Sequence, residues 1–380
     1  MTIQSSKVWF YLDCMEVGGP ERIVLNLLTA LSKAGWAPVL VLNEARGALL
    51  HAVPEGVPVR SLGTPKFAPA TRALAHLIRV ERPDLIISQR SCLNAIAVLA
   101  ILLSRHRAKL VLAEHTLLSE WLKNDRMPKR LIDHLIYRSS PVLYRAADAV
   151  VGISQGVLNE LENLLRLPSR RLKLLYNPII PENVGSLSEA PLALPWEPDS
   201  KPVILGVGRL SPEKGFDMLL DAFARVLSQR PSRLVIVGAG PEREAVQAKA
   251  QTLGVADLVH FVGYQENVYP WLRRAKVLAL SSVLESFPTV LVEAMAVGTP
   301  VVAFDCPKGP GEIITHEENG LLIPPRDPAA LAEGILRIFG DPELAVRLSE
   351  GGGRRAADFT FNRTLGAYVS LFQSLLQKHA

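Results

Sequence analysis

Residues 202–229, PVILGVGRLSPEKGFDMLLDAFARVLSQ, join an apolar run of strand length to a stretch of helix length. The first part is rich in Val, Ile and Leu, as strands buried on both faces are. In the second part apolar residues recur at helical spacing on one stripe: Phe216, Leu219, Leu220, Phe223, Val226 and Leu227. A buried strand followed by a helix that packs on the sheet predicts an α/β fold.

The same kind of apolar run recurs along the chain. The runs cover residues 8–13, 37–43, 84–88, 109–115, 148–154, 202–208, 233–238 and 276–281. Longer amphipathic stretches separate them, which is the pattern of parallel strands with crossover helices. We therefore expect doubly wound, Rossmann-like parallel sheets.

At 380 residues the chain is long enough for two domains. Proline-rich and acidic composition with weak periodicity marks a linker over residues 181–200. We expect one domain over 1–180, a second over 201–361, and a cleft between them. The amphipathic helix expected over 362–380 packs back on the first domain.

Bulk composition limits the class of protein. Three cysteines without paired metal spacing argue against a disulfide framework and a structural zinc, and no apolar run approaches the ~20 residues of a membrane span. We expect a cytoplasmic protein. The formal net charge of +5 is modest, and no surface combines aromatic and basic residues, so no nucleic-acid partner is expected.

Loops that follow strands are where doubly wound sheets bind ligands. Arg209 and Lys214 follow the strand at 202–208 and can direct two cations to one space, which suits a diphosphate; two solvated loop cations are the alternative. VGAG at 237–240 lacks the third glycine of the dinucleotide fingerprint.

Two acids flank an expected helix start at residues 285–293. Pro288 fits the first turn, and the free N–H groups of Ser286, Phe287, Thr289 and Val290 would form an anion seat. Glu285 precedes this seat and Glu293 follows it. Carboxylates would repel a phosphate, so we expect them to hold sugar hydroxyls; a capping acid and a solvated glutamate are the alternative.

These motifs, in this order, resemble the retaining, metal-independent glycosyltransferases of the GT-B fold, family 4 (glycosyl transferases group 1) type. The resemblance rests on E-x7-E at Glu285 and Glu293, on GRLSPEKG upstream and on MAVGTPVVAFDCPKGPGEII downstream. It implies an enzyme of two domains, the first binding the acceptor and the second binding a nucleoside-diphosphate sugar. Related sequences extend lipid-linked, capsular or exopolysaccharide glycans.

The resemblance also implies residue roles. Glu285 would contact the donor sugar, Glu293 the ribose, and Arg209 and Lys214 the diphosphate. Gly18 and Gly19 match the glycine-rich loop after the first strand, and His115 matches a histidine that reaches the transferring sugar. We take Glu285, His115, Arg209 and Lys214 as catalytic candidates. The nucleotide base is expected at 262–268, which includes Gly263, Tyr264, Gln265 and Val268.

No DxD pair follows a strand in metal-binding form, so neither a metal nor another cofactor is expected. The resemblance suggests uridine as the base and a glycan or polyprenyl-linked acceptor. Residues 121–146 mix basic and apolar side chains and would contact an anionic membrane or cover the sheet. A UDP-sugar 2-epimerase-like enzyme and a non-catalytic nucleotide-sugar-binding protein stay open as alternatives.

Overall fold

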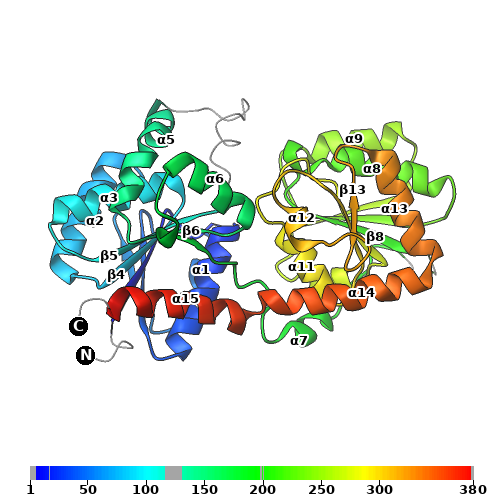
Figure 1. Cartoon of the computed structure of the whole chain (residues 1–380). Coiled ribbons are helices and arrows are strands. Elements are labelled where there is room, and N and C mark those ends of the chain that lie inside the picture. Colours follow the sequence, from blue (N-terminus) through cyan, green and yellow to red (C-terminus); the bar gives the residue numbers. More distant parts are fainter. Residues whose placement is uncertain (1–5, 17, 116–130, 197–198, 200, 378–380) are drawn as a thin grey trace. The chain divides into compact units, whose positions relative to one another are not determined.

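The structure is a computed structural model that describes residues 6–16, 18–115, 131–196, 199 and 201–377. It divides into two compact units (Figure 1). The first unit is Met1–Pro178 with Phe361–Ala380, and the second is Ile179–Thr360. The described part of the segment that we expected as a linker, 181–200, belongs to the second unit and contains the helix α7, Val184–Ser188.

The first unit contains a seven-stranded parallel sheet in the order β3-β2-β1-β4-β5-β6-β7. Its strands are β1 Lys7–Leu12, β2 Ala37–Leu42, β3 Val59–Ser61, β4 Leu85–Gln89, β5 Lys109–Glu114, β6 Ala149–Gly152 and β7 Leu172–Leu174. Its helices are α1 Gly19–Lys33, α2 Phe67–Glu81, α3 Ser91–Ser104, α5 Leu131–Leu143, α6 Gln155–Leu165 and α15 Phe361–Leu376, with 3-10 turns η2 Leu50–Ala52, η3 Tyr144–Ala146 and η4 Ser169–Arg171.

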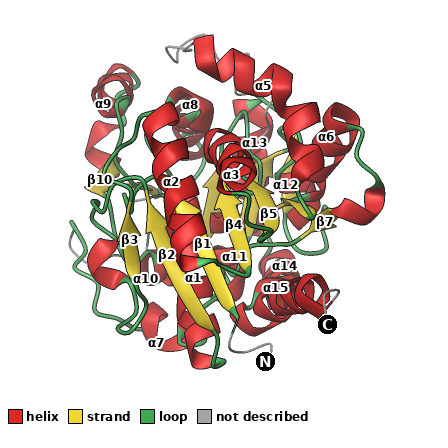
Figure 2. Ribbon diagram, turned by 90° about the vertical axis from the view of Figure 1, so that its left-hand side faces the viewer, coloured by secondary structure: helices red, strands yellow, loops and turns green. Residues whose placement is uncertain are grey.

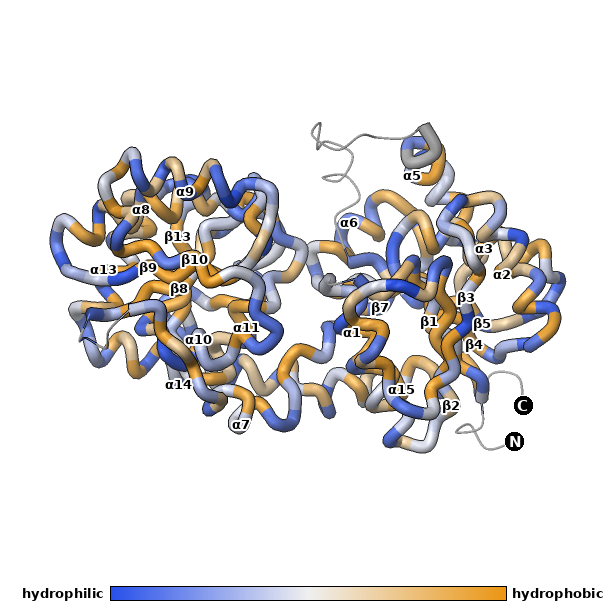
Figure 3. Tube along the Cα trace, turned by 180° about the vertical axis from the view of Figure 1, so that it is seen from behind, coloured by the Kyte–Doolittle hydropathy of each residue, from blue (hydrophilic) through white to orange (hydrophobic). Residues whose placement is uncertain are grey.

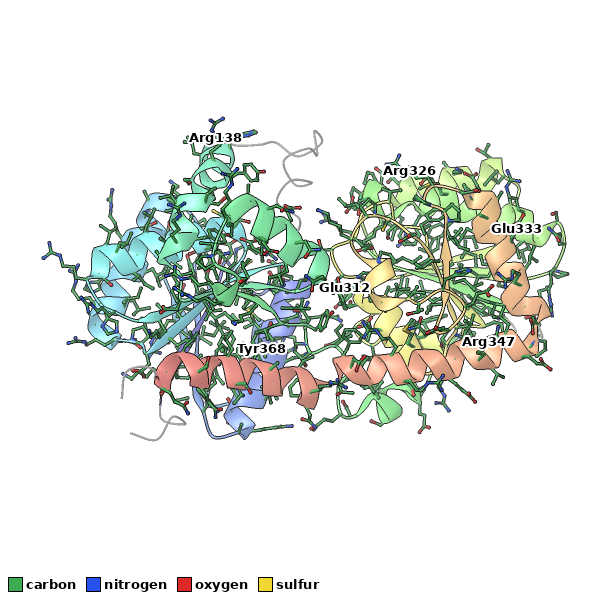
Figure 4. All side chains as sticks on the ribbon, viewed as in Figure 1. Arg138, Glu312, Arg326, Glu333, Arg347 and Tyr368 are labelled. Carbon is green, nitrogen blue, oxygen red and sulfur yellow. The ribbon has the colours of Figure 1, made fainter. Side chains whose placement is uncertain are left out.

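Helices cover both faces of this sheet (Figure 2). α1 and α15 share one core with β1, β2, β4, β5 and β6, and α2 and α3 pack together on the opposite face. Tyr368, labelled on α15 in Figure 4, is 1% exposed. The ring of Phe372 meets Phe10 and Trp36 edge-on, so the C-terminal helix packs in the core of the first unit.

The second unit contains a six-stranded parallel sheet in the order β10-β9-β8-β11-β12-β13. Its strands are β8 Val203–Val207, β9 Arg233–Val237, β10 Val259–Gly263, β11 Val277–Leu280, β12 Val301–Phe304 and β13 Leu321–Ile323. Its other helices are α8 Phe216–Leu227, α9 Arg243–Thr252, α10 Tyr269–Arg274, α11 Thr289–Ala296, α12 Pro310–Ile313, α13 Pro328–Gly340 and α14 Pro342–Ala356, with 3-10 turns η5 Pro212–Lys214, η6 Ala256–Leu258 and η7 Ala357–Phe359.

The strands of each unit are its most hydrophobic part (Figure 3). The predicted stripe of α8 lies in the core of the second unit: Phe216, Leu219, Leu220, Phe223 and Val226 are at most 5% exposed, and Leu227 packs at its edge. The prediction of doubly wound parallel sheets is confirmed. Both sheets reverse their strand order once, between β1 and β4 and between β8 and β11.

Candidate functional site

The loops after β8 and β11 meet at the point where the second sheet reverses its strand order. Val283 N donates to Glu213 O at 2.9 Å, and Ser281 Oγ donates to Lys214 O at 3.0 Å. Parallel sheets bind ligands beyond the carboxyl ends of strands at such a reversal. The expected donor residues Arg209, Lys214 and Glu285 therefore come from the two loops best placed to bind a ligand.

Gly215 makes the close approach of these loops possible. Its φ is +61°, and a Cβ there would lie 2.3 Å from the carbonyl oxygen of Ser281. Only glycine adopts this conformation without strain and leaves space for the neighbouring carbonyl. Gly215 therefore lets the loop that carries Lys214 lie directly against Ser281.

Lys214 and Glu285 contact each other directly. Lys214 Nζ lies 2.5 Å from Glu285 Oε1, and Ser282 Oγ donates to the same oxygen at 2.7 Å. Glu285 is 8% exposed, and the Lys214 side chain is 24% exposed. We expected the lysine to contact a diphosphate and the glutamate a sugar; without ligand they neutralise each other.

Arg209 is exposed, and among the described residues its guanidinium has no salt bridge. The helix α11 begins at Thr289, one residue later than the expected Pro288, and no side chain of its N-cap residue bonds to its first turn. Glu293 is the fifth residue of α11 and is partly buried. A free cation and an uncapped helix start thus lie on the two loops that meet at the strand reversal, and both favour an anion.

A third loop, after β12, closes on the segment around Glu285. A Cβ on Gly309 would lie 2.7 Å from Glu285 Cβ and 3.2 Å from Pro288 Cδ. Burial raises the pKa of the Cys306 thiol to about 12, the charge of Glu285 adds to the increase, and Lys214 opposes it. Cys306 is therefore a neutral thiol beside the pair.

The loops after β9 and β10 border the same edge of the sheet. A Cβ on Gly238 would lie 1.9 Å from Gly208 O, and Gly238 N donates to Gly263 O at 2.8 Å. Gln265 Nε2 donates to Val262 O at 3.1 Å, and Tyr264 is 47% exposed. Val268 is 9% exposed, so its side chain packs inward, and Gly263 and Tyr264 remain more accessible to a base.

The first unit has its own cluster at its strand reversal. A Cβ on Gly18 would lie 2.2 Å from Glu21 Oε2, whereas Gly19 faces open space. Arg90 Nη2, after β4, donates to Glu21 Oε1 at 2.6 Å. Burial raises the pKa of Glu21, and Arg90 opposes this. The absent side chain of Gly18 leaves room for the carboxylate of Glu21, which the sequence did not single out.

His115 follows β5 and is 7% exposed. Its Nε2 contacts Gln89 Oε1, and its Nδ1 has no hydrogen-bond partner among the described residues. Burial, with Arg90 as a smaller contribution, lowers the pKa of the imidazole to about 3. His115 is therefore neutral at physiological pH, and it suits hydrogen bonding better than proton abstraction.

Glu114, beside His115, was missed by the sequence reasoning. Its carboxylate is 0% exposed and accepts hydrogen bonds from Tyr144 Oη, from Asn94 Nδ2 at 2.8 Å and from Ser91 Oγ at 3.0 Å. Burial raises the pKa of Glu114 to about 7, and the three hydrogen bonds oppose the increase. An acid at the end of an otherwise apolar strand was the signal available in the sequence.

Two family models match the chain. "Glycosyltransferase Family 4" matches residues 17–183, and "Glycosyl transferases group 1" matches residues 195–355. The first range covers β2 to β7 of the first sheet, and the second range covers all six strands of the second sheet. No helix in the described parts of the chain combines the length and hydrophobicity needed to span a membrane.

Similar proteins differ in how much of them the chain covers. The exopolysaccharide phosphotransferase of Streptomyces coelicolor is 37% identical over 57% of this chain, but the chain spans only 23% of that protein. A Campylobacter jejuni N-acetylgalactosamine-N,N'-diacetylbacillosaminyl-diphospho-undecaprenol 4-alpha-N-acetylgalactosaminyltransferase is 26% identical over 93% of this chain and 95% of its own. Anabaena HepE, solved with UDP-glucose, has a TM-score of 0.79 at 21% identity, over 97% and 99% of the two chains. This last likeness shows a shared fold.

Proposed function

Since the chain belongs to the group 1, family 4 type glycosyltransferases and has their GT-B fold, we propose that this enzyme moves a hexose from a nucleoside-diphosphate sugar to a glycan or lipid-linked acceptor. The observation that carries the proposal is the Lys214–Glu285 pair at the strand reversal of the second unit, with Arg209 on the same loop as Lys214. In the proposed donor seat the two cations would bind the diphosphate and Glu285 would accept a hydrogen bond from a sugar hydroxyl.

The donor diphosphate would occupy the space beside Arg209 and Lys214. As it arrives, Lys214 exchanges Glu285 for phosphate oxygens, and Glu285 becomes available for a sugar hydroxyl. N–H groups at the start of α11 add donors for the phosphate, and Glu293 would take the ribose. Substrate binding thus replaces an internal ion pair with two contacts to the ligand.

The leaving diphosphate develops negative charge as the glycosidic bond breaks. Arg209, Lys214 and the N–H groups of α11 would stabilise it without a metal ion. We propose retention of anomeric configuration by front-face attack, in which the departing phosphate helps to take the acceptor's proton. His115, held neutral by burial, would hydrogen-bond the transferring sugar.

A uridine donor is supported by the shared fold of HepE, which was solved with UDP-glucose. A lipid-linked or polysaccharide acceptor is supported by the Campylobacter relative, named for a diphospho-undecaprenol substrate. Of the proposed membrane segment 121–146, residues 121–130 lie outside the described residues. In α5 Leu135 and Val142 are 57% and 68% exposed, and Arg138 lies at the outer surface (Figure 4). These side chains favour peripheral contact with an anionic membrane at its cytoplasmic face.

Thermal stabilisation by nucleotides tests the donor seat without knowledge of the acceptor. We expect UDP and UDP-sugars to raise the melting temperature of the wild type and to have a much smaller effect on Lys214→Met. If no nucleoside diphosphate or nucleotide sugar raises it, the assignment is wrong. NMR of the product then reads the anomeric configuration. Release of free nucleotide and an altered sugar without acceptor would indicate the epimerase-like alternative.

A further inference from the structure

A cavity of about 330 Å³ opens at the amino ends of β5, β6 and β7 in the first unit. Its walls come from the first residues of β5 and β6, from η3 and η4, from β7 and from α15. Residues in a strand rise about 3.3 Å each, so this edge lies about 20 Å along β5 from His115. The cavity is therefore separate from the cluster at the carboxyl ends of these strands.

Positive side chains dominate the lining of this cavity. Five of them contribute: Lys109, Arg145, Arg170, Arg171 and Lys173. Asp148 is the one carboxylate among the described lining residues, and it already accepts hydrogen bonds from Lys109 Nζ and from Leu110 N, both at 3.0 Å. The other four cations are left without a counter-charge in the cavity.

Most of these four are available to a ligand. Arg171 Nη1 donates to the carbonyl oxygen of Arg145 at 2.6 Å, which fixes its guanidinium at the wall. The side chains of Arg145, Arg170 and Lys173 make no hydrogen bond or salt bridge with any residue that the structure describes. Guanidinium and ammonium groups that line one cavity match an anion with several oxygens.

One wall of the cavity is apolar. Leu371 and Leu375 lie one turn apart on α15, and both line the cavity. Leu371 is 8% exposed and Leu375 is partly buried, so the leucines form a packed surface beside the cations. A ligand that fills this space would carry an anionic group on one side and an apolar part on the other. The volume is at the lower end of the range for small-molecule sites, about 300–1,000 Å³.

We propose that this cavity is a second anion site, which binds a phosphate-bearing ligand. Arg145, Arg170 and Lys173 hold a phosphomonoester or diphosphate group. The apolar part of the ligand lies against the α15 leucines. Such a group has two sources, a soluble phosphate compound or the headgroup of a phosphate-bearing lipid, and the experiment separates them.

The experiment uses the full chain with Arg209→Ser and Lys214→Met, because a free diphosphate would otherwise also bind the proposed donor seat. In the soluble arm, calorimetry at low salt measures binding of inorganic pyrophosphate. In the lipid arm, sedimentation measures binding to phosphatidylcholine vesicles with and without phosphatidic acid. The cavity variant adds Arg145→Ser, Arg170→Ser and Lys173→Ser. The control instead adds Lys66→Ser, Arg72→Ser and Arg107→Ser, which remove the same charge from exposed positions of the same unit.

The parent is the chain with Arg209→Ser and Lys214→Met alone. We expect the cavity variant to bind at least one of the two probes at least tenfold more weakly than the parent, and we expect the affinity of the control variant to stay within about twofold of the parent. Loss in the soluble arm identifies a soluble ligand, and loss in the lipid arm identifies a headgroup. The proposal is overturned if the parent binds neither probe, or if cavity and control variants lose binding equally. Arg145→Ser, Arg170→Ser and Lys173→Ser are also measured one at a time in the parent. If the triple cavity variant does not fold, these three single variants still test the proposal.

Discussion

Lys214 Nζ lies 2.5 Å from Glu285 Oε1, although the two residues are 71 positions apart in the sequence. Gly215 and Ser281 bring their loops together, and the mostly buried carboxylate depends on the lysine for its charge balance. The proposed donor seat thus contains an ion pair in the absence of a ligand. Substitutions at either end should therefore change both stability and turnover.

We expect Lys214→Met to leave Ser282 as the side-chain donor to Glu285 Oε1 among the described residues and to lower the free energy of unfolding by about 1–3 kcal/mol. Turnover should fall about 100-fold or more, because a donor to the leaving phosphate is lost. Urea unfolding and a donor-consumption assay measure the two effects. The matched control is Lys276→Met, an exposed lysine of the same unit. Full turnover in Lys214→Met would contradict the site assignment.

The buried carboxyl of Glu114 predicts a specific pH dependence of stability. Its pKa is 4.5 when unfolded and about 7 when folded, so between these values the folded state binds more protons. The contribution of Glu114 to stability is therefore fully present below about pH 4.5 and is lost as pH rises to about 7. Glu114→Gln stays uncharged, so it should gain stability relative to wild type between pH 5 and pH 8. If the difference in free energy of unfolding between the wild type and Glu114→Gln does not change with pH, the raised pKa of Glu114 is refuted.

The buried imidazole of His115 predicts the opposite pH dependence of stability. Burial lowers its pKa from 6.5 to about 3, so below pH 6.5 the unfolded chain binds a proton that the folded chain does not. Its contribution is present above pH 6.5 and is lost as pH falls toward 3. We expect His115→Asn to reduce the loss of stability between pH 6.5 and 4, measured by urea unfolding. An ionisation of His115 near 6.5, read by NMR of the wild type, would contradict this account.

Most of the fold could be predicted because its central strands are continuous apolar runs, as at β1, β4 and β8. β12, Val301–Phe304, was not identified although its four residues are apolar and buried. β3, β7 and β13 were not identified because each has only three residues and lies at a sheet edge, where β3 and β7 tolerate a cation, Arg60 or Lys173. β10 begins with Val259 and His260 and is only partly buried, so it shows no apolar run either.

The candidate site was predictable where loops follow recognisable strands, as for Arg209, Lys214 and Glu285. The contact between Lys214 and Glu285 could not be predicted, because it depends on strand order. β8 and β11 are neighbours in the sheet, although β9 and β10 lie between them in the sequence. Glu21 and Arg90 were missed for the same reason, since β1 and β4 adjoin in space and not in sequence.

The proposed absence of a metal is directly testable. If Arg209, Lys214 and the start of α11 stabilise the leaving diphosphate, EDTA should leave turnover within about twofold, and added Mg²⁺ should not raise it. Turnover is measured after dialysis against chelator, with and without metal. If EDTA lowers turnover tenfold and Mg²⁺ restores it, Arg209 and Lys214 do not suffice to stabilise the leaving diphosphate.

Gly215→Ala separates a steric clash from backbone strain, because the chain contains a matched control. Gly215 and Gly254 have φ values of +61° and +69°, but a Cβ would lie 2.3 Å from Ser281 O at Gly215, whereas nothing lies within 4 Å of one at Gly254. Gly254→Ala should cost about 1 kcal/mol, the usual cost of alanine in this conformation. Gly215→Ala should cost about 2 kcal/mol more and weaken nucleotide binding, because Ser281 must move away from Lys214. Urea unfolding and nucleotide-induced thermal shifts measure both; equal losses in the two variants would mean that the loops can separate without disturbing the ion pair.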